Sequence, residues 1–403
     1  MKITRSTIYF TLLFLVIVFV ENLFYIKEIN NGRYLDISIL ITVVLFLTTS
    51  IIPSGKKHSI SIYIYFFLIL TLIGLLIAVN RGNDLLEIVG NYRYFLLFIL
   101  YFPTKKILQD KSKRELFSLL FTLLGVGYAG LNLIQYFLYP KVIFLQGINY
   151  AFRGDSVRFY SGFYITVTVI FFLIYYFFNA KNKLLKILCT IALFCNMMYL
   201  MEVTLIRNAT FSVLFAIFII ILLQKEYKYI WKLTLVLAAA SIFFFVFGAN
   251  LNTLLQSALE DSTGTGAFRV TLYKYVFSNL IYSPIFGYGF ISPYSINVPY
   301  NIHVDTGFVG FIYEFGLMGL IWAIILLLKF IKLTIKLYKN NNKKSYLYIS
   351  YILYTIVIAL FNCPFNTKEL IVYFVIIYSL LENDVKDMEN EYKLKNINSY
   401  SSI

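Results

Sequence analysis

Charged residues are scarce in this sequence. They make up 14% of the 403 residues, whereas hydrophobic residues make up 60%, and the mean hydropathy is +0.77. A water-soluble domain of this length needs more polar surface than such a composition supplies, so a soluble globular protein is excluded. The composition is typical of a chain whose solvent is a lipid bilayer.

Residues that bind metals or nucleotides are also few. The chain has two histidines and three cysteines, and the cysteines lie in or beside apolar runs without the CxxC spacing of zinc sites. No GxxxxGK[ST] sequence is present. We therefore expect no metal and no cofactor, and either an already activated substrate or a gradient as the energy source. The net charge of +15 is spread between hydrophobic runs, which argues against nucleic acid as a partner.

Long apolar runs recur along the whole chain. They predict an all-α, polytopic integral membrane bundle of about twelve transmembrane helices in a single domain, residues 1–403. The expected spans are 7–25, 35–52, 60–79, 92–102, 116–138, 160–178, 184–201, 208–223, 230–247, 306–328, 346–361 and 370–381. Spans 92–102 and 370–381 are short, so an interfacial or re-entrant helix is the alternative for each.

The distribution of lysine and arginine predicts how these spans are oriented. Every second connection is basic, and most of the 35 lysines and arginines fall in those connections or near the two termini. The positive-inside rule then places both termini in the cytoplasm and the connection between the ninth and tenth spans outside the membrane. Residues 382–403 are polar and mixed in charge, and we expect a loosely ordered cytoplasmic tail there.

The extracytoplasmic connection 250–305 is the candidate functional region, because it is too polar and too rich in Gly and Pro to lie in lipid. Its apolar residues recur at every fourth position from 268 to 280, which predicts an amphipathic helix capped by Thr263 or Thr265. Pro284 ends this helix, and Gly287 and Gly289 predict a tight turn.

Four arginines are expected on the outer side, where positive charge is disfavoured. Arg153 and Arg158 precede the sixth span, Arg207 lies between the seventh and eighth, and Arg269 lies on the predicted helix one turn before Tyr273. Guanidinium groups bind phosphate oxygens in a forked geometry, so these arginines predict a site for a phosphate-bearing substrate. The alternative is that they extend to the membrane interface or pair with nearby acidic residues, which are Asp155, Glu202 and Asp261.

His303 precedes the tenth span, and Asp305 follows two residues later. An imidazole beside a carboxylate is suited to accept a proton near neutral pH. The alternative is a hydrogen-bonded histidine at the membrane interface. Because no second histidine or outward carboxylate pair accompanies His303, we expect a metal-independent reaction in which arginines stabilise a departing phosphate.

These motifs resemble those of the O-antigen ligase and O-antigen polymerase superfamily of bacterial envelope proteins. The matching positions are Arg207 in TLIRN, Arg269, the P-x-x-G-x-G turn at 284–289, His303, and G-x-x-G at 316–319. The resemblance implies glycosyl transfer at the outer face of the bacterial cytoplasmic membrane, with undecaprenyl-pyrophosphate-linked oligosaccharides as substrates. It also implies that Arg207 and Arg269 bind the pyrophosphate and that His303 lies at the acceptor.

Three functions fit these features. The first is a polymerase that joins lipid-linked repeat units into an O-antigen or capsule, with a chain-length regulator as a candidate partner. The sequence His303-Val304-Asp305, where ligases often carry His-Asn, favours this function and makes Asp305 a candidate catalytic residue. The second is a ligase that transfers finished glycan to an acceptor. The third is a flippase or transporter, against which stand the lack of an internal repeat and the clustering of polar residues at one face.

Overall fold

The described part of the chain is almost entirely helical. The computed structural model describes residues 5–23, 31–50, 60–141, 150–153, 156–159, 162–224, 265–291 and 306–400. Its first half contains α1 (Arg5–Val20), α2 (Asn31–Ser50), α3 (Ser61–Asn80), α4 (Leu85–Tyr92), the 3₁₀ helix η1 (Arg93–Leu100), α5 (Tyr101–Ile107), α6 (Lys111–Leu138), β1 (Tyr150–Arg153), β2 (Ser156–Phe159) and α7 (Phe163–Asn179). Its second half contains α8 (Lys183–Met198), the π-helix η2 (Tyr199–Thr204), α9 (Arg207–Leu223), α11 (Thr265–Leu280), α13 (Phe308–Lys339), α14 (Ser345–Ile358) and α15 (Lys368–Tyr400).

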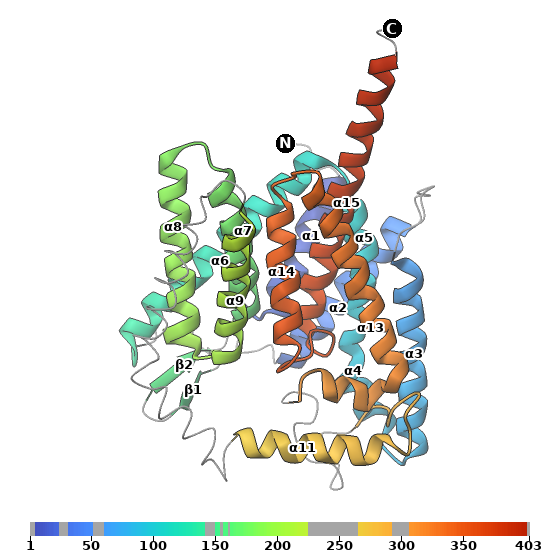
Figure 1. Ribbon diagram of the computed structural model, residues 1–403. Coiled ribbons are helices and arrows are strands. Elements are labelled where there is room, and N and C mark those ends of the chain that lie inside the picture. The colour runs from blue at the N-terminus through green and yellow to red at the C-terminus, as the bar shows by residue number, and fades with distance from the viewer. Residues whose placement is uncertain are drawn as a thin grey trace.

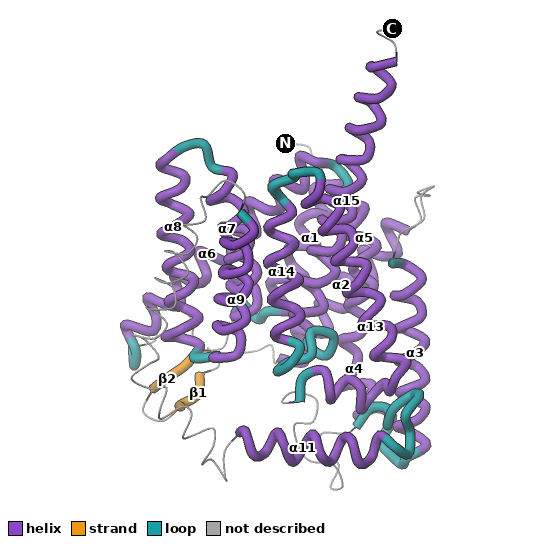
Figure 2. Tube along the Cα trace, in the orientation of Figure 1, coloured by secondary structure: helices purple, strands orange, loops and turns teal. Residues whose placement is uncertain are grey.

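Most of these helices run between two ends of a bundle (Figure 1). Both chain termini lie at one end, which we call the terminus end. The antiparallel hairpin of β1 and β2 and the transverse helix α11 lie at the opposite end, which we call the α11 end (Figure 2). The bundle therefore has two distinct faces: one carries the hairpin and α11, and the projecting end of α15 (Lys368–Tyr400) leaves from the other (Figure 1).

Among the described residues, six helical segments are long and apolar enough to cross a membrane. By length and composition they are Gly32–Thr49, Ser61–Asn80, Leu85–Ile107, Lys111–Leu138, Lys183–Thr204 and Phe308–Lys339. The shorter apolar helices are Arg5–Val20, Phe163–Asn179, Asn208–Leu223 and Ser345–Ile358. The expectation of a helical integral membrane protein is thus confirmed. The count of twelve stays a prediction, because the expected ninth span, 230–247, lies outside the described residues.

Helix α15 occupies the centre of the bundle. Every residue from 370 to 385 is buried, and the helix packs against α1, η1, α5, α7 and α13. A helix that is apolar on all sides must be surrounded, as the first turns of α15 are. An aromatic cluster joins other helices to the same core. Trp322 of α13 stacks on Phe67 of α3 at 4.0 Å between ring centroids, and its Nε1 donates to the carbonyl of Tyr63 at 2.8 Å.

Short polar side chains set where several helices begin. Asp84 accepts from the backbone N–H of Glu87 at the start of α4, and Asp110 accepts from Ser112 at the start of α6. Asn182 caps α8 in the same way. Each side-chain oxygen satisfies a backbone donor that has no partner within the helix.

The expected short span 92–102 is part of a longer crossing. The structure is helical from Leu85 to Ile107 without interruption, through α4, η1 and α5. The expected boundaries, 92 and 102, were therefore too narrow at both ends, although the span correctly included Arg93. In the structure its Nε donates to Asp36 of α2 at 2.5 Å, and this pairing lowers the cost of its position.

The expectation of a loosely ordered tail from residue 382 is wrong. Helix α15 continues to Tyr400, and Glu382, Asn383 and Asp384 are buried. These side chains look like a solvated tail in sequence. In the fold, Glu382 pairs with Lys105 of α5, and Asp384 accepts from Arg114 of α6 and Tyr348 of α14. Asn383 donates to the backbone carbonyls of Lys105 and Leu108.

Candidate functional site

The predicted site residues fall into three groups. His303 and Asp305 lie outside the described residues. Three others are placed by their backbone, with Arg153 as the last residue of β1, Arg207 as the first of α9 and Arg269 near the start of α11. Arg158 on β2 and Tyr273 on α11 have half-buried side chains.

The described segments that carry these residues all lie at the α11 end (Figure 1). Strand β2, with Arg158, contacts η2, and η2 leads within three residues to Arg207. The start of α11, with Arg269, is directed toward the hairpin side of this end. The structure therefore collects four chain segments bearing arginine at one face of the bundle.

The local structure before Arg207 is unusual. The π-helical turn η2 ends at Leu205, whose φ of 51° and ψ of 29° lie in the left-handed region. Bulky residues rarely adopt this conformation, and π-helical turns are frequent at functional sites. Helix α9 then begins at Arg207, and no side chain among the described residues caps its first turn. The backbone N–H groups of this turn and the positive end of the helix dipole provide a setting for an anion.

Helix α11 confirms the helix that the sequence predicted. Leu272 and Val276 of its apolar stripe are fully buried and pack with Ile291 and Tyr313. Arg269 and Tyr273 are four residues apart and so share one face of α11. The helix is thus fixed against α13 by one stripe, and the neighbouring stripe carries the candidate residues.

The turn after α11 is locked to α13 through the backbone. Gly287 and Gly289 have φ of 72° and 73°, which confirms the predicted tight turn. It meets α13 where Gly316, with φ of 62° and ψ of −156°, interrupts the helix. Four backbone hydrogen bonds join the two, from Tyr288 to Tyr313 (2.7 Å), Gly289 to Glu314 (3.0 Å), Leu317 to Pro284 (2.8 Å) and Met318 to Ile285 (3.1 Å).

Glycine is required at this junction because there is no room for a side chain. A Cβ at Gly316 would lie 2.4 Å from the carbonyl oxygen of Ile285, and one at Gly287 would lie 2.6 Å from the backbone of Glu314. The P-x-x-G-x-G and G-x-x-G motifs are therefore two halves of one structural joint.

A buried carboxyl group that the sequence did not single out lies at this joint. Glu314 is 0% exposed, and its two oxygens accept from Tyr92 Oη (2.9 Å) and Asn366 Nδ2 (2.8 Å). Tyr92 Oη also accepts from the backbone N–H of Ile291, just after the motif turn (3.3 Å). Glu314 thus ties α4, the motif turn and the loop before α15 to α13.

A fifth arginine at this end was also missed. The guanidinium carbon of Arg81, which follows α3, lies 3.8 Å from the ring centroid of Tyr288. The other stacking partner of Tyr288 is Tyr313, at 4.8 Å with an interplanar angle of 7°. A signal was present in sequence, since Arg81 directly follows an apolar span on the side that the sequence predicts to be the outer one, where cations are disfavoured.

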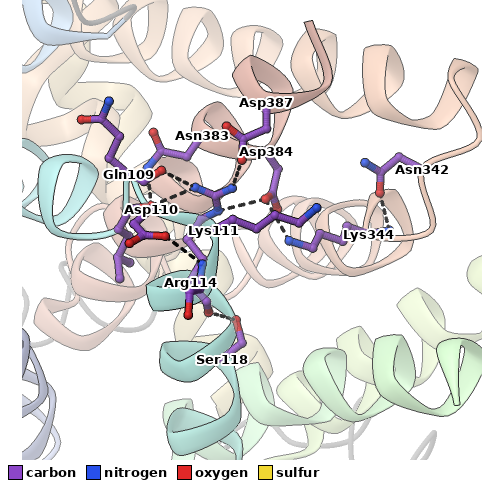
Figure 3. Close-up of polar contacts among 12 residues, drawn as sticks. Gln109, Asp110, Lys111, Arg114, Ser118, Asn342, Lys344, Asn383, Asp384 and Asp387 are labelled. Carbon is purple, nitrogen blue, oxygen red and sulfur yellow. Dashed lines mark hydrogen bonds and ion pairs between the residues drawn. The ribbon is translucent and has the colours of Figure 1, made fainter. Parts of the chain in front are cut away.

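A second polar cluster lies at the terminus end (Figure 3). Arg114 is 1% exposed and donates to Asp384, Asp387 and the carbonyls of Leu108 and Gln109. Lys344 and Tyr348 also donate to Asp384. A cavity of about 370 Å³ here is lined by both acidic and basic side chains. Since its charges are mutually paired, we interpret the cluster as the anchor of α15.

Metal ligands are not grouped in the described part of the chain. No three His, Cys, Asp or Glu residues among the described ones lie close enough to hold a metal ion. Because His303 and Asp305 are not among them, the metal-independent reaction stays a prediction.

The fold and the arginine-bearing end define a polytopic membrane protein with a candidate anion site at one face. Residues 191–324 match a family model described as O-antigen ligase. This match runs from α8 through η2, α9 and α11 into α13, and it contains Arg207, Arg269, the motif turn and the Gly316 joint. The match of residues 191–324 supports the resemblance to the O-antigen ligase and polymerase superfamily that the motifs indicated. No curated protein matches the chain.

Proposed function

We propose that this protein polymerises undecaprenyl-pyrophosphate-linked oligosaccharide repeat units into a surface polysaccharide. The observation that carries the proposal is the gathering at the α11 end of the segments that bear four arginines, Arg153, Arg158, Arg207 and Arg269. The last two lie within the region that matches the O-antigen ligase family model. A membrane enzyme that uses a lipid pyrophosphate needs clustered cations at one interface, because the lipid tail holds the anionic head there.

In the proposed reaction, a hydroxyl oxygen of the acceptor unit forms a bond to the reducing-end anomeric carbon of the other glycan. The bond from that carbon to the pyrophosphate oxygen breaks, and undecaprenyl pyrophosphate leaves. Arg207, Arg269 and the first turn of α9 stabilise the charge that develops on the leaving group. His303, oriented by Asp305, takes the hydroxyl proton. Arg153, Arg158 and Tyr273 contact the substrate.

The proposal places the protein in the bacterial cytoplasmic membrane with the α11 end outside. The terminus end carries Lys105, Lys106, Lys111, Lys343 and Lys344, which supports a cytoplasmic position under the positive-inside rule. Both termini are then cytoplasmic, and the candidate site faces the side on which surface glycans are assembled.

A ligase is the second candidate function, because the matching family model is described as O-antigen ligase. Both activities use the same lipid-linked donor and differ in the acceptor. The pyrophosphate site is therefore the same in both, and only the acceptor side distinguishes them.

Deletion of the gene tests the function directly. A polymerase predicts single repeat units on the normal acceptor, whereas long polymer left on its lipid carrier indicates a ligase and intermediates trapped on the cytoplasmic leaflet indicate a flippase. In complemented cells, Arg207→Ala or Arg269→Ala is expected to abolish chain growth with normal amounts of protein in the membrane, and His303→Ala to reduce it severely. Electrophoresis of the surface glycan measures each result. Polymer of normal length in both arginine variants contradicts the assignment.

A further inference from the structure

Arg81 is held in a defined position without using its hydrogen-bonding capacity. Its guanidinium stacks on Tyr288, which is itself fixed by the ring of Tyr313 and by the backbone bond to the Tyr313 carbonyl. The side chain is exposed and makes no hydrogen bond or ion pair with any residue that the structure describes. Stacking leaves the edge donors of a guanidinium free for an anion. By contrast, Arg93 on the neighbouring η1 is paired with Asp36.

The exposed apolar surface of α3 indicates that Arg81 lies at the depth of the lipid head groups. Helix α3 presents a stripe of exposed apolar side chains along its length that includes Ile69, Leu72, Leu76 (66% exposed) and Val79, and Arg81 follows directly. Leu86, the second residue of α4, is 81% exposed. In an integral membrane protein such a stripe faces acyl chains, so Arg81 lies where that hydrocarbon ends.

The position of Arg81 is far from Arg269, which belongs to the pyrophosphate site of the proposed function, because the two lie at opposite ends of α11. Arg269 lies near the start of α11, whereas Tyr288 follows its end. A helix of 16 residues is about 24 Å long. Polymerisation requires two lipid-linked units, and the acceptor unit keeps its own pyrophosphate at a distance from the reacting hydroxyl. Two separate anion sites on opposite ends of α11 meet this requirement.

We propose that Arg81, held on Tyr288, binds the pyrophosphate of the acceptor unit, while Arg207 and Arg269 bind that of the donor. The proposal rests on the proposed function and adds a second lipid-pyrophosphate site, open to the bilayer beside α3 and α4. A bulk anionic phospholipid carries the same phosphate chemistry, and the test separates the two sources.

The test is native mass spectrometry of the full-length protein in phosphatidylcholine nanodiscs titrated with undecaprenyl pyrophosphate. Two molecules per chain are expected for the wild type. Arg81→Ala is expected to weaken the second binding event about 10- to 100-fold, the effect of losing charge-assisted hydrogen bonds, with the first unchanged. For Arg81→Lys, the affinity of the second binding event is expected to lie between those of the wild type and Arg81→Ala. An ammonium keeps the charge, but it cannot stack on a ring and at the same time donate two parallel hydrogen bonds to a phosphate. Lys141→Ala, a matched outward cation that follows α6, is expected to retain both events.

The other possible outcomes distinguish failure of the Arg81 inference from failure of the proposed function. Two full-affinity events in Arg81→Ala overturn this inference and leave the donor site intact. If the second event disappears in the wild type when phosphatidylglycerol replaces phosphatidylcholine, the site belongs to bulk lipid and the inference is also overturned. Two events in the Arg207→Ala/Arg269→Ala double variant instead contradict the proposed function, since the donor site would then not need these arginines.

Discussion

Tyr92 and Glu314 form a buried contact between residues 222 positions apart. Tyr92→Phe removes the hydroxyl that serves Glu314 and the N–H of Ile291, and both groups stay buried. We expect a loss of about 1–3 kcal/mol in the free energy of unfolding, because a buried polar group is left with one partner fewer. Thermal unfolding of the purified protein in detergent measures this loss.

Tyr94→Phe is the matched control, since it removes a tyrosine hydroxyl two residues further on, in the adjacent helix η1. Tyr94 makes no hydrogen bond to the described residues, so we expect a change below about 0.5 kcal/mol. Equal effects of the two substitutions would show that the Glu314 contact does not stabilise the joint.

Glu314 could not be predicted as a structural centre from the sequence. It lies in the apolar span 306–328, and its partners Tyr92 and Asn366 come from distant segments. Arg207 and Arg269 were recognisable because a cation at the outer end of a span is conspicuous locally. The sequence shows when a charged residue adjoins an apolar span, but it does not show which distant residues contact it in the fold.

At the scale of elements, the joint between the motif turn and α13 depends on glycine. Gly316→Ala would place a Cβ against the Ile285 carbonyl and force an L residue into a conformation that glycine alone adopts readily. We expect a loss of more than about 2 kcal/mol in stability and loss of chain growth. Gly127→Ala in α6 is the control. No atom lies within 4 Å of its added Cβ, and Ala in a helix interior is favoured by about 0.5–1 kcal/mol.

Elements whose signals lie within a few residues of one another were predicted correctly from the sequence. Elements that depend on contacts between distant segments were not. Helix α11 and its terminating turn were predicted correctly, because a four-residue apolar period, a proline and two glycines act within a few residues. The π-helical turn before Arg207 was not predicted, since it has no local composition signal. The end of α15 was wrongly read as a tail, because Arg114, Lys105 and Lys344 come from elsewhere in the chain to pair with it.

At the scale of the whole molecule, the orientation in the membrane decides whether the candidate site meets its substrate. In a variant with its native cysteines replaced, Ser278→Cys on α11 is expected to react with a membrane-impermeant maleimide in intact spheroplasts. Ser112→Cys, at the terminus end of α6, is expected to react only after permeabilisation, because the proposed orientation places the lysine-rich face in the cytoplasm. The reverse pattern would place the arginines in the cytoplasm and exclude extracytoplasmic glycan assembly.

The helical membrane architecture was predictable from apolar runs, since these are properties of continuous stretches. How the helices surround one another was not, and the central place of α15 is the clearest case. Its apolar segment 370–381 seemed marginal as a span, yet it is buried on every side. Its burial results from the helices that pack around it and not from the length of its apolar segment.

The central position of α15 has a consequence for biosynthesis. Its residues emerge from the ribosome after those of every helix that surrounds it, so the earlier helices must wait in the bilayer around an unfilled axis. During that interval their inward apolar faces are covered by lipid or by the insertion machinery. Closure of the bundle is therefore completed only after the surrounding helices have been inserted, when α15 displaces those temporary occupants.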